Sequence, residues 1–273
     1  MKIPLEDLFE DIVGKAQRGL GVDDRRLSEK LKITVEQLRE LKRGSGDNSL
    51  VPAVAAALNL DPAALEGSYA QSWFPQSVPS VNGVAQFNTE ILGMTVNAYV
   101  IWDPETNEGA IFDTGADASN MLAFVKTRGL QIRDLFITHT HEDHVACLRD
   151  IVDATKARIF SPELEPLPNA TAVRAGQEFR VGNLALEARL TNGHSRGGTS
   201  YVVRGLLVPV VVVGDSLFAG SMGGGNVSYQ DALRNNLEKI LTLPDQTIIC
   251  PGHGPMTTVG EEKQHNPFFA GKV

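Results

Sequence analysis

The sequence predicts an α/β protein preceded by a small all-helical region. From about residue 84 onward, short apolar runs typical of strands alternate with segments of helical periodicity. Before residue 68, apolar residues recur at helical spacing only. A histidine-rich stretch at residues 138–144 directly follows an apolar run, which indicates where the chemistry lies.

The composition is that of a folded protein with one large domain or two ordinary ones. The chain has 273 residues, of which 42% are hydrophobic and 21% charged. Its net charge of −8 disfavours electrostatic binding of nucleic acid or of an anionic membrane by the whole molecule. The longest apolar run, residues 206–214, is too short to span a bilayer, and the first residues lack the apolar core of a signal peptide. We therefore expect a cytoplasmic protein that does not associate with membranes.

Cysteine is scarce. Cys147 and Cys250 are the two cysteines of the sequence and lie far apart in it. A disulfide framework needs more cysteines than this, so we expect both thiols to be free in a reducing compartment.

Residues 1–67 are predicted to form a helical domain. The first helix is expected to have an apolar face made of Leu5, Leu8, Ile12 and Ala16. Thr34 is predicted to cap a helix that extends to residue 43, and Asp61 precedes the proline that starts a last short helix. Between them, further helices are expected around residues 27–31 and 50–58.

The order of these helices resembles the lambda-repressor-like helix-turn-helix family, with residues 34–43 as the recognition helix. The charges disfavour a nucleic-acid partner for residues 1–67, because residues 1–70 carry ten basic and twelve acidic groups. In addition, Glu36 and Glu40 would face the phosphates. A helical bundle would show the same periodicity if it dimerised, giving a homo-oligomer, or if it covered an active site. These alternatives therefore stay open.

Residues 68–80, with Pro75 and Pro79, are the predicted linker to a second domain at residues 81–273. The aromatic pair Trp73 and Phe74 is expected to dock on one of the domains. In the second domain, a hairpin is predicted from residues 96–103 and 109–113. The further elements are a helix at 118–128, a strand at 135–138, a helix at 142–154, strands at 157–160, 184–190, 200–204 and 208–214, a helix at 230–241 and a strand at 247–250.

The stretch 138–144 predicts a metal site. Alternation along an extended segment places the side chains of His139 and His141 on the same side, so that both reach one ion. Asp143 and His144 are adjacent and must diverge, which suits a second ion nearby. Imidazole nitrogen and carboxylate oxygen suit zinc, iron or manganese.

This His-x-His-x-Asp-His pattern resembles the signature of the metallo-β-lactamase fold superfamily. The later parts of that signature follow in order at Asp113 in residues 111–115, Gly193-His194, Gly214-Asp215 and residues 251–254 around His253. Residues 214–221 and 243–268 are similar to the glyoxalase II-like branch in particular. The resemblance covers about residues 80–273 and implies a four-layer αββα sandwich.

The resemblance also implies a site for two divalent metal ions, with zinc favoured and iron or manganese as alternatives. Each ion takes three ligands, and one carboxylate bridges the pair. The implied ligands are His139, His141 and His194 for the first ion, Asp143, His144 and His253 for the second, and Asp215 for both. Asp113 is expected to brace the metal-binding loop rather than to bind an ion.

The implied activity is that of a hydrolase in which a metal-bound hydroxide cleaves a small-molecule thioester or related ester, as in hydroxyacylglutathione hydrolases. Asp143 is predicted to orient the hydroxide and to accept its proton. Substrate-binding residues are not predicted, because residues 145–147 and 223–226 depart from the glyoxalase II pattern. The sequence also ends before the C-terminal helical domain that holds glutathione in full-length glyoxalase II.

Two other functions fit the same motifs. Persulfide dioxygenases resemble this sequence and use one Fe(II), which His139, His194 and Asp215 would hold here. Alternatively, the helical domain binds DNA and the metallo-β-lactamase-like domain senses a metabolite, which makes the protein a regulator.

Overall fold

The computed structural model describes residues 2–91 and 93–272. Five short helices come first in the chain: α1 (Phe9–Leu20), α2 (Asp24–Leu31), α3 (Val35–Lys42), α4 (Val51–Ala57) and α5 (Pro62–Tyr69). Within the described ranges, none of the helices is both long enough and apolar enough to cross a membrane.

The cap predicted at Thr34 is confirmed, and Asp61 caps the last of the predicted helices. The Thr34 side chain accepts a hydrogen bond from the backbone N–H of Gln37 at the start of α3. The Asp61 side chain does the same for Ala64 at the start of α5. Each cap satisfies a backbone donor that has no partner within its own helix.

The apolar face predicted for the first helix is wrong at its beginning. Leu5 and Leu8 precede α1, and the Leu8 side chain is 52% exposed. Helical spacing does not apply to an extended segment, so these two residues do not share a face with Ile12 and Ala16, which are buried.

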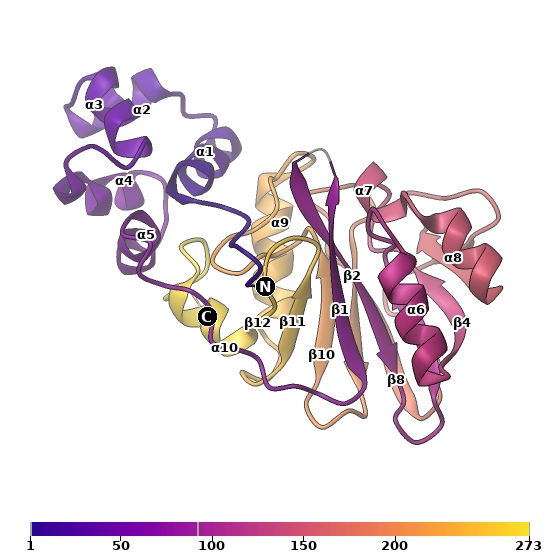
Figure 1. Cartoon of the computed structure of the whole chain (residues 1–273). Coiled ribbons are helices and arrows are strands. Elements are labelled where there is room, and N and C mark those ends of the chain that lie inside the picture. The colour runs from indigo at the N-terminus through magenta and orange to yellow at the C-terminus, as the bar shows by residue number, and fades with distance from the viewer. Residues whose placement is uncertain (1, 92, 273) are drawn as a thin grey trace.

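Two six-stranded sheets follow (Figure 1). The first runs in sequence order through β1 (Val84–Ile91), β2 (Met94–Trp102), β3 (Glu108–Phe112), β4 (Gln131–Phe136), β5 (Arg158–Pro162) and β6 (Thr171–Val173). The second has the order β12-β11-β10-β9-β8-β7, with bounds β7 (Glu178–Val181), β8 (Leu184–Leu190), β9 (Thr199–Arg204), β10 (Val210–Gly214), β11 (Ile248–Pro251) and β12 (Thr257–Thr258).

Both sheets are apolar on both faces, which builds four layers. In β10, Val210 and Val212 pack between the sheets, whereas Val211 and Val213 pack against helices on the outer face. The helices outside the second sheet are α9 (Tyr229–Asn235) and α10 (Val259–His265), and those outside the first are α6 (Ser119–Arg128) and α8 (Leu148–Thr155). The predicted αββα sandwich is therefore confirmed.

Two predicted helices are interrupted. The expected helix over 142–154 is split into α7 (Glu142–Val145) and α8, because the Cys147 backbone N–H donates to Thr114 Oγ1 instead of continuing the helix. The expected helix over 230–241 is α9 followed by a π-helical turn, Asn236–Ile240. Both thiols are free and buried, as expected.

The carboxyl ends of four strands meet at one edge of the sandwich. β3 is parallel to β4, and β10 is parallel to β11. Backbone hydrogen bonds join the two sheets there: Thr199 N–H donates to Thr138 O (2.9 Å), and Asn97 N–H donates to Gly252 O (2.7 Å). The loops that leave these strands are thus held close together.

The N-terminal helices pack directly on the second sheet's outer layer. One continuous apolar cluster contains Phe9 and Leu65 from the helices together with Phe268 and Phe269 from the C-terminal region. In the segment between α5 and β1, Trp73 donates from Nε1 to Glu261 Oε2 (3.1 Å) and stacks on His265. The prediction that this segment docks is confirmed.

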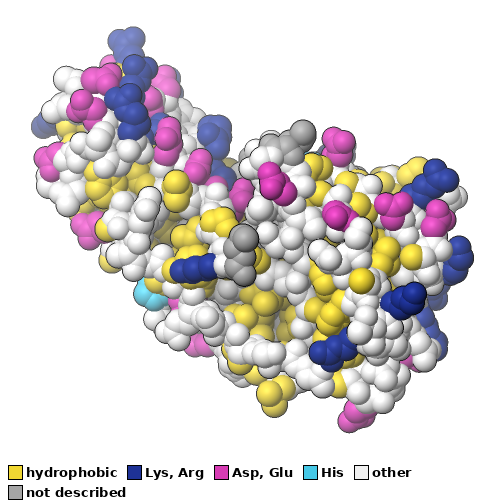
Figure 2. All heavy atoms as spheres, viewed as in Figure 1, with side chains coloured by type: hydrophobic (Ala, Val, Ile, Leu, Met, Phe, Trp, Pro, Cys, Tyr) yellow, Lys and Arg dark blue, Asp and Glu magenta, His cyan; other side chains and the backbone are white. Residues whose placement is uncertain are grey.

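Basic and acidic side chains are paired over α2 and α3. Arg25 lies 3.0 Å from Glu29, and Arg43 lies 2.7 Å from Glu36. Figure 2 shows dark-blue and magenta side chains intermingled over the N-terminal helices on this face. Such a surface lacks the uniform positive potential that attracts duplex DNA, and DNA binding by this region stays a disfavoured alternative.

Candidate metal centre

The structure brings all seven predicted ligands together at the strand-end edge. Two groups of side chains form, each with its ligand atoms within 4.8 Å of one another. The first group is His139, His141, His194 and Asp215, and the second is Asp143, His144 and His253. They come from the loops after β4, β8, β10 and β11, which are far apart in sequence.

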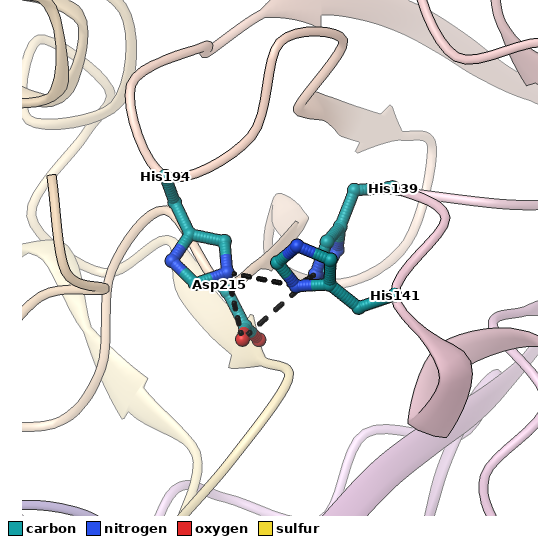
Figure 3. Close-up of side chains that lie close together, drawn as sticks. All are labelled: His139, His141, His194 and Asp215. Carbon is teal, nitrogen blue, oxygen red and sulfur yellow. Dashed lines mark hydrogen bonds and ion pairs between the residues drawn. The ribbon is translucent and has the colours of Figure 1, made fainter. Parts of the chain in front are cut away.

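In the first group, three imidazoles surround one point (Figure 3). His141 Nδ1 lies 3.0 Å from His139 Nε2 and 3.1 Å from His194 Nε2. Asp215 Oδ2 completes the group at 3.5 Å from His194 Nε2 and 3.9 Å from His139 Nε2.

In the second group, two imidazoles face two carboxylates. Asp143 Oδ2 lies 3.3 Å from His144 Nε2 and 3.2 Å from His253 Nε2. Asp215 also reaches this group, because its Oδ1 is 3.3 Å from His144 Nε2 and its Oδ2 is 3.3 Å from His253 Nε2. Asp215 therefore lies between the two groups and contacts both.

Hydrogen bonds between Nδ1 and a neighbouring oxygen orient four histidines so that Nε2 points to the centre. Two of the oxygens belong to side chains: Thr138 Oγ1 lies 3.1 Å from His139 Nδ1, and Asp113 Oδ2 lies 2.9 Å from His144 Nδ1. The other two are backbone carbonyl oxygens: Gly224 O lies 3.1 Å from His194 Nδ1, and Thr95 O lies 2.6 Å from His253 Nδ1. With the Nδ1 proton donated to oxygen, Nε2 keeps a free lone pair. Ligating histidines in proteins are usually held in this way.

Asp113 supports the centre without joining either ligand group. Its two carboxylate oxygens accept hydrogen bonds from Thr138 N–H (2.7 Å) and Thr138 Oγ1 (2.8 Å), and from the His144 ring. Its backbone has φ +55°, a left-handed conformation that Asp adopts more readily than most residues. Asp113 thus ties the end of β3 to the histidine-rich loop.

The pKa values of the ring nitrogens differ between the groups. Burial and the nearby His144 hold the pKa of His139 well below its ordinary value, and burial lowers that of His194. Burial opposes the charged form of His253 too, but Asp215 and Asp143 outweigh it and raise its pKa to about 11.

Both carboxylates of the centre remain ionised. Burial would raise the pKa of Asp143 and of Asp215, but the neighbouring imidazoles of His144 and His253 lower both. A buried carboxylate beside a half-buried one requires positive charge nearby, either as protons on imidazole or as metal cations.

The donor set fits metal ions. Ligands that lie about 2.0–2.1 Å from a tetrahedral ion are roughly 3.3 Å apart, and the donor separations given above, 3.0–3.9 Å, bracket that value. Moreover, His144 Nε2 and Asp215 Oδ1 are buried without a hydrogen-bond partner, although both point into the centre. A cation between them would satisfy both atoms.

Two glycines allow the loops to come this close. A Cβ atom on Gly252 would overlap Asp215 Oδ1, and one on Gly214 would overlap the Thr138 side chain. Gly214 also has φ +50°. A larger residue at Gly252 would push apart the loops of His253 and Asp215, and one at Gly214 would push apart the loops of Asp215 and His139.

Glu165 is a residue of the centre that the sequence did not reveal. Its carboxylate accepts hydrogen bonds from the backbone N–H groups of Thr140 (2.9 Å) and Gly197 (2.7 Å). It thereby joins the loop of His139 and His141 to the loop of His194. No spacing or motif marks it, because its partners are backbone groups that leave no trace in the sequence.

Comparison with known proteins gives the same assignment as the geometry. A family model described as the Metallo-beta-lactamase superfamily matches residues 92–253. The chain is 30% identical over 202 residues to the probable metallo-hydrolase YqgX of Bacillus subtilis, which covers 64% of this chain and 92% of that protein. It is 29% identical over 213 residues to the hydroxyacylglutathione hydrolase GloC of Haemophilus influenzae, covering 68% and 99%.

Among solved structures, the fold is similar to that of ETHE1 from Myxococcus xanthus. The TM-score is 0.60 at 27% sequence identity, and the match covers 69% of this chain and 86% of that one.

Proposed function

The chain belongs to the metallo-beta-lactamase superfamily, and we propose that this metallo-hydrolase cleaves a thioester or related ester of a small molecule. The observation that carries the proposal is the position of Asp215, which contacts a group of three histidines on one side and the pair His144 and His253 on the other. One shared carboxylate between two donor groups is the arrangement of a two-metal site. The similarity to a hydroxyacylglutathione hydrolase supports the thioester class.

In this proposal, each group holds one divalent ion and Asp215 contacts both. The ligands are His139, His141 and His194 for one ion and Asp143, His144 and His253 for the other. When bound, two such ions supply a water of near-neutral pKa and positive charge for a carbonyl oxygen under attack. Zinc is the favoured metal, and iron or manganese would suit the same donors.

Asp143 is the proposed general base. Its side chain is 17% exposed, compared with 8% for Asp215, so water and substrate reach it more readily. It accepts the proton of the attacking water, while His144 and His253 hold its carboxylate in place. A thiolate is a competent leaving group, so the chain needs no separate acid for a thioester.

The test uses the full-length protein loaded in turn with zinc, manganese and Fe(II). We expect release of thiol from members of a thioester panel that includes a hydroxyacylglutathione, with activity that follows metal content. A fully loaded protein that releases no thiol from any member would refute the proposal.

The similarity to ETHE1 supports a second candidate, a persulfide dioxygenase with one Fe(II) at His139, His194 and Asp215. Oxygen consumption with glutathione persulfide distinguishes it from the leading proposal. Uptake of oxygen by the Fe(II) protein, without thioester cleavage by any metal form, would replace the hydrolase assignment.

A further inference from the structure

The segment that precedes α1 runs along the metal centre. A Cβ on Gly254, next to His253, would lie 3.2 Å from the backbone nitrogen of Glu6 and 3.5 Å from the carbonyl oxygen of Pro4. Figure 1 shows the indigo N-terminal segment beside the yellow loop that follows β11. The helical region therefore reaches the centre through this segment.

Side chains at successive positions of this segment, residues 5–7, point in opposite directions. Leu5 and Asp7 line a cavity of about 440 Å³ that Trp73 and Phe74 also line, away from the metal ligands. Glu6 lies between them in sequence and points the other way, with its Oε2 3.9 Å from His253 Nδ1. This alternation is expected of an extended chain.

The position of Glu6 is fixed by its neighbour. Asp7 is buried, forms an ion pair with Lys15 and accepts a hydrogen bond from Ser221 Oγ. Lys15 also donates to Met222 O (2.9 Å). Ser221 and Met222 follow Asp215 in the loop after β10, so these contacts join the segment to the metal-binding loop.

The Glu6 carboxylate has no donor of its own. His253 Nδ1 gives its proton to Thr95 O at 2.6 Å, so His253 acts on Glu6 only through its charge across 3.9 Å and donates no hydrogen bond to it. Lys15, the nearest lysine that influences Glu6, is engaged by Asp7 and Met222. Within residues 2–91 and 93–272, no hydrogen bond reaches this carboxylate, whose side chain is only 26% exposed. A half-buried anion without a donor gains most from a cationic partner.

We propose that Glu6 determines substrate specificity by binding the positively charged group of a cationic thioester beside His253. The inference rests on the proposed hydrolase function and names its substrate class. Attraction to Glu6 acts on the charge of the substrate and not on the reacting carbonyl, so it favours cationic over neutral substrates of the same shape.

The test compares two substrates that differ only in charge: acetylthiocholine and its neutral carbon isostere, 3,3-dimethylbutyl thioacetate. For the metal-loaded full-length protein, kcat/KM is measured with both. We expect Glu6→Gln to lower the ratio of cationic to neutral kcat/KM by roughly tenfold, the size of one partly screened charge pair. Glu6→Lys should lower the ratio further. Glu10→Gln, which changes an exposed carboxylate in the first turn of α1, should leave it unchanged.

Binding of the two thiol products, thiocholine and 3,3-dimethylbutane-1-thiol, gives a readout without turnover. Calorimetry should show that Glu6→Gln weakens the binding of thiocholine and not that of the neutral thiol. An unchanged ratio, or equal losses for the cationic and neutral compounds, would overturn the role of Glu6. If the wild-type protein cleaves no member of the thioester panel, these two esters included, but still binds thiocholine in a Glu6-dependent manner, the hydrolase proposal fails and the cation site stands.

Discussion

The histidines of the centre are oriented by atoms that are not ligands. Four of them donate Nδ1–H to an oxygen, and the most buried of these contacts joins His144 to Asp113. Because Asp113 also holds Thr138, one carboxylate controls both a ligand and the loop that carries two others.

Asp113→Asn tests this support. Asn tolerates the left-handed backbone at this position, but an amide replaces the negative charge that orients His144. We expect metal affinity to fall by roughly 10- to 100-fold, as for other partners of metal ligands, with the fold intact by circular dichroism. Competition with a chelator of known affinity measures the change, and an unaltered affinity would show that Asp113 is dispensable.

Asp215→Ala tests the shared carboxylate. Its removal takes a contact from both donor groups, so we expect metal content and activity to fall together, activity by more than about 100-fold. Elemental analysis of the purified variant measures the first, and thiol release the second. Asp153→Ala is the matched control, since Asp153 is exposed on α8. Full metal content with full activity in Asp215→Ala would contradict the shared role.

Sequence reasoning located the candidate ligands and Asp113, but not the other residues that surround them. His139, His141, Asp143 and His144 occupy one short stretch whose spacing carries the signal by itself. Glu165 and Glu6 act through contacts with backbone groups or loops distant in sequence. Such contacts depend on how the loops pack, and no periodicity encodes that.

At the level of elements, strand positions were predicted better than helix continuity. β8 has the predicted bounds, whereas the helix predicted over 142–154 breaks at Cys147. Apolar spacing persists through such a break, because both pieces bury the same face. The hydrogen bond from Cys147 to Thr114 that interrupts the helix is a tertiary contact.

α10 contains a buried carboxylate that links stability to pH. Glu262 accepts hydrogen bonds from Asn266, Thr257 and the N–H of Gly220, but burial outweighs them and raises its pKa from 4.5 to about 7. Between these two values the folded protein keeps a proton that the unfolded chain has released. Stability contributed by this group is therefore complete below about pH 4.5 and is lost as the pH rises through about 7.

Glu262→Gln should remove this pH dependence. Because of this group, the wild-type free energy of unfolding should fall by roughly 3 kcal/mol between pH 4.5 and 8. The variant should not show this fall. Urea unfolding across this range measures it. Glu66→Gln, at an exposed position in α5, should behave like the wild type. Parallel pH curves for Glu262→Gln and the wild type would contradict the assignment.

At the scale of the whole molecule, the helical region and the sandwich share one core. Phe9 and Leu65 from the helices pack in the same cluster as Phe268 and Phe269, and Tyr229 of α9 contacts Gly19 of α1. The sequence predicts the helical region and the sandwich correctly, each from its own periodicity. It does not predict that they pack together, because each part's periodicity records only that a face is apolar and not what covers it.

The shared core predicts one cooperative unfolding transition for the full chain. Scanning calorimetry should show a single peak, and Phe269→Ala should shift it as a whole, since removal of a buried Phe costs about 3–5 kcal/mol. Two resolved transitions, with only one moved by the substitution, would show that the helical region folds independently.

The contact between α1–α5 and the distant residues 268–269 also constrains how the protein is made. The ribosome releases the N-terminal helices long before Phe268 and Phe269 leave the exit tunnel. Until then, the apolar side chains of Phe9 and Leu65 lack the part of their native cover that Phe268 and Phe269 provide, and the nascent chain exposes hydrophobic surface that chaperones bind. Folding of the first helices is thus completed only after most of the chain has been synthesised.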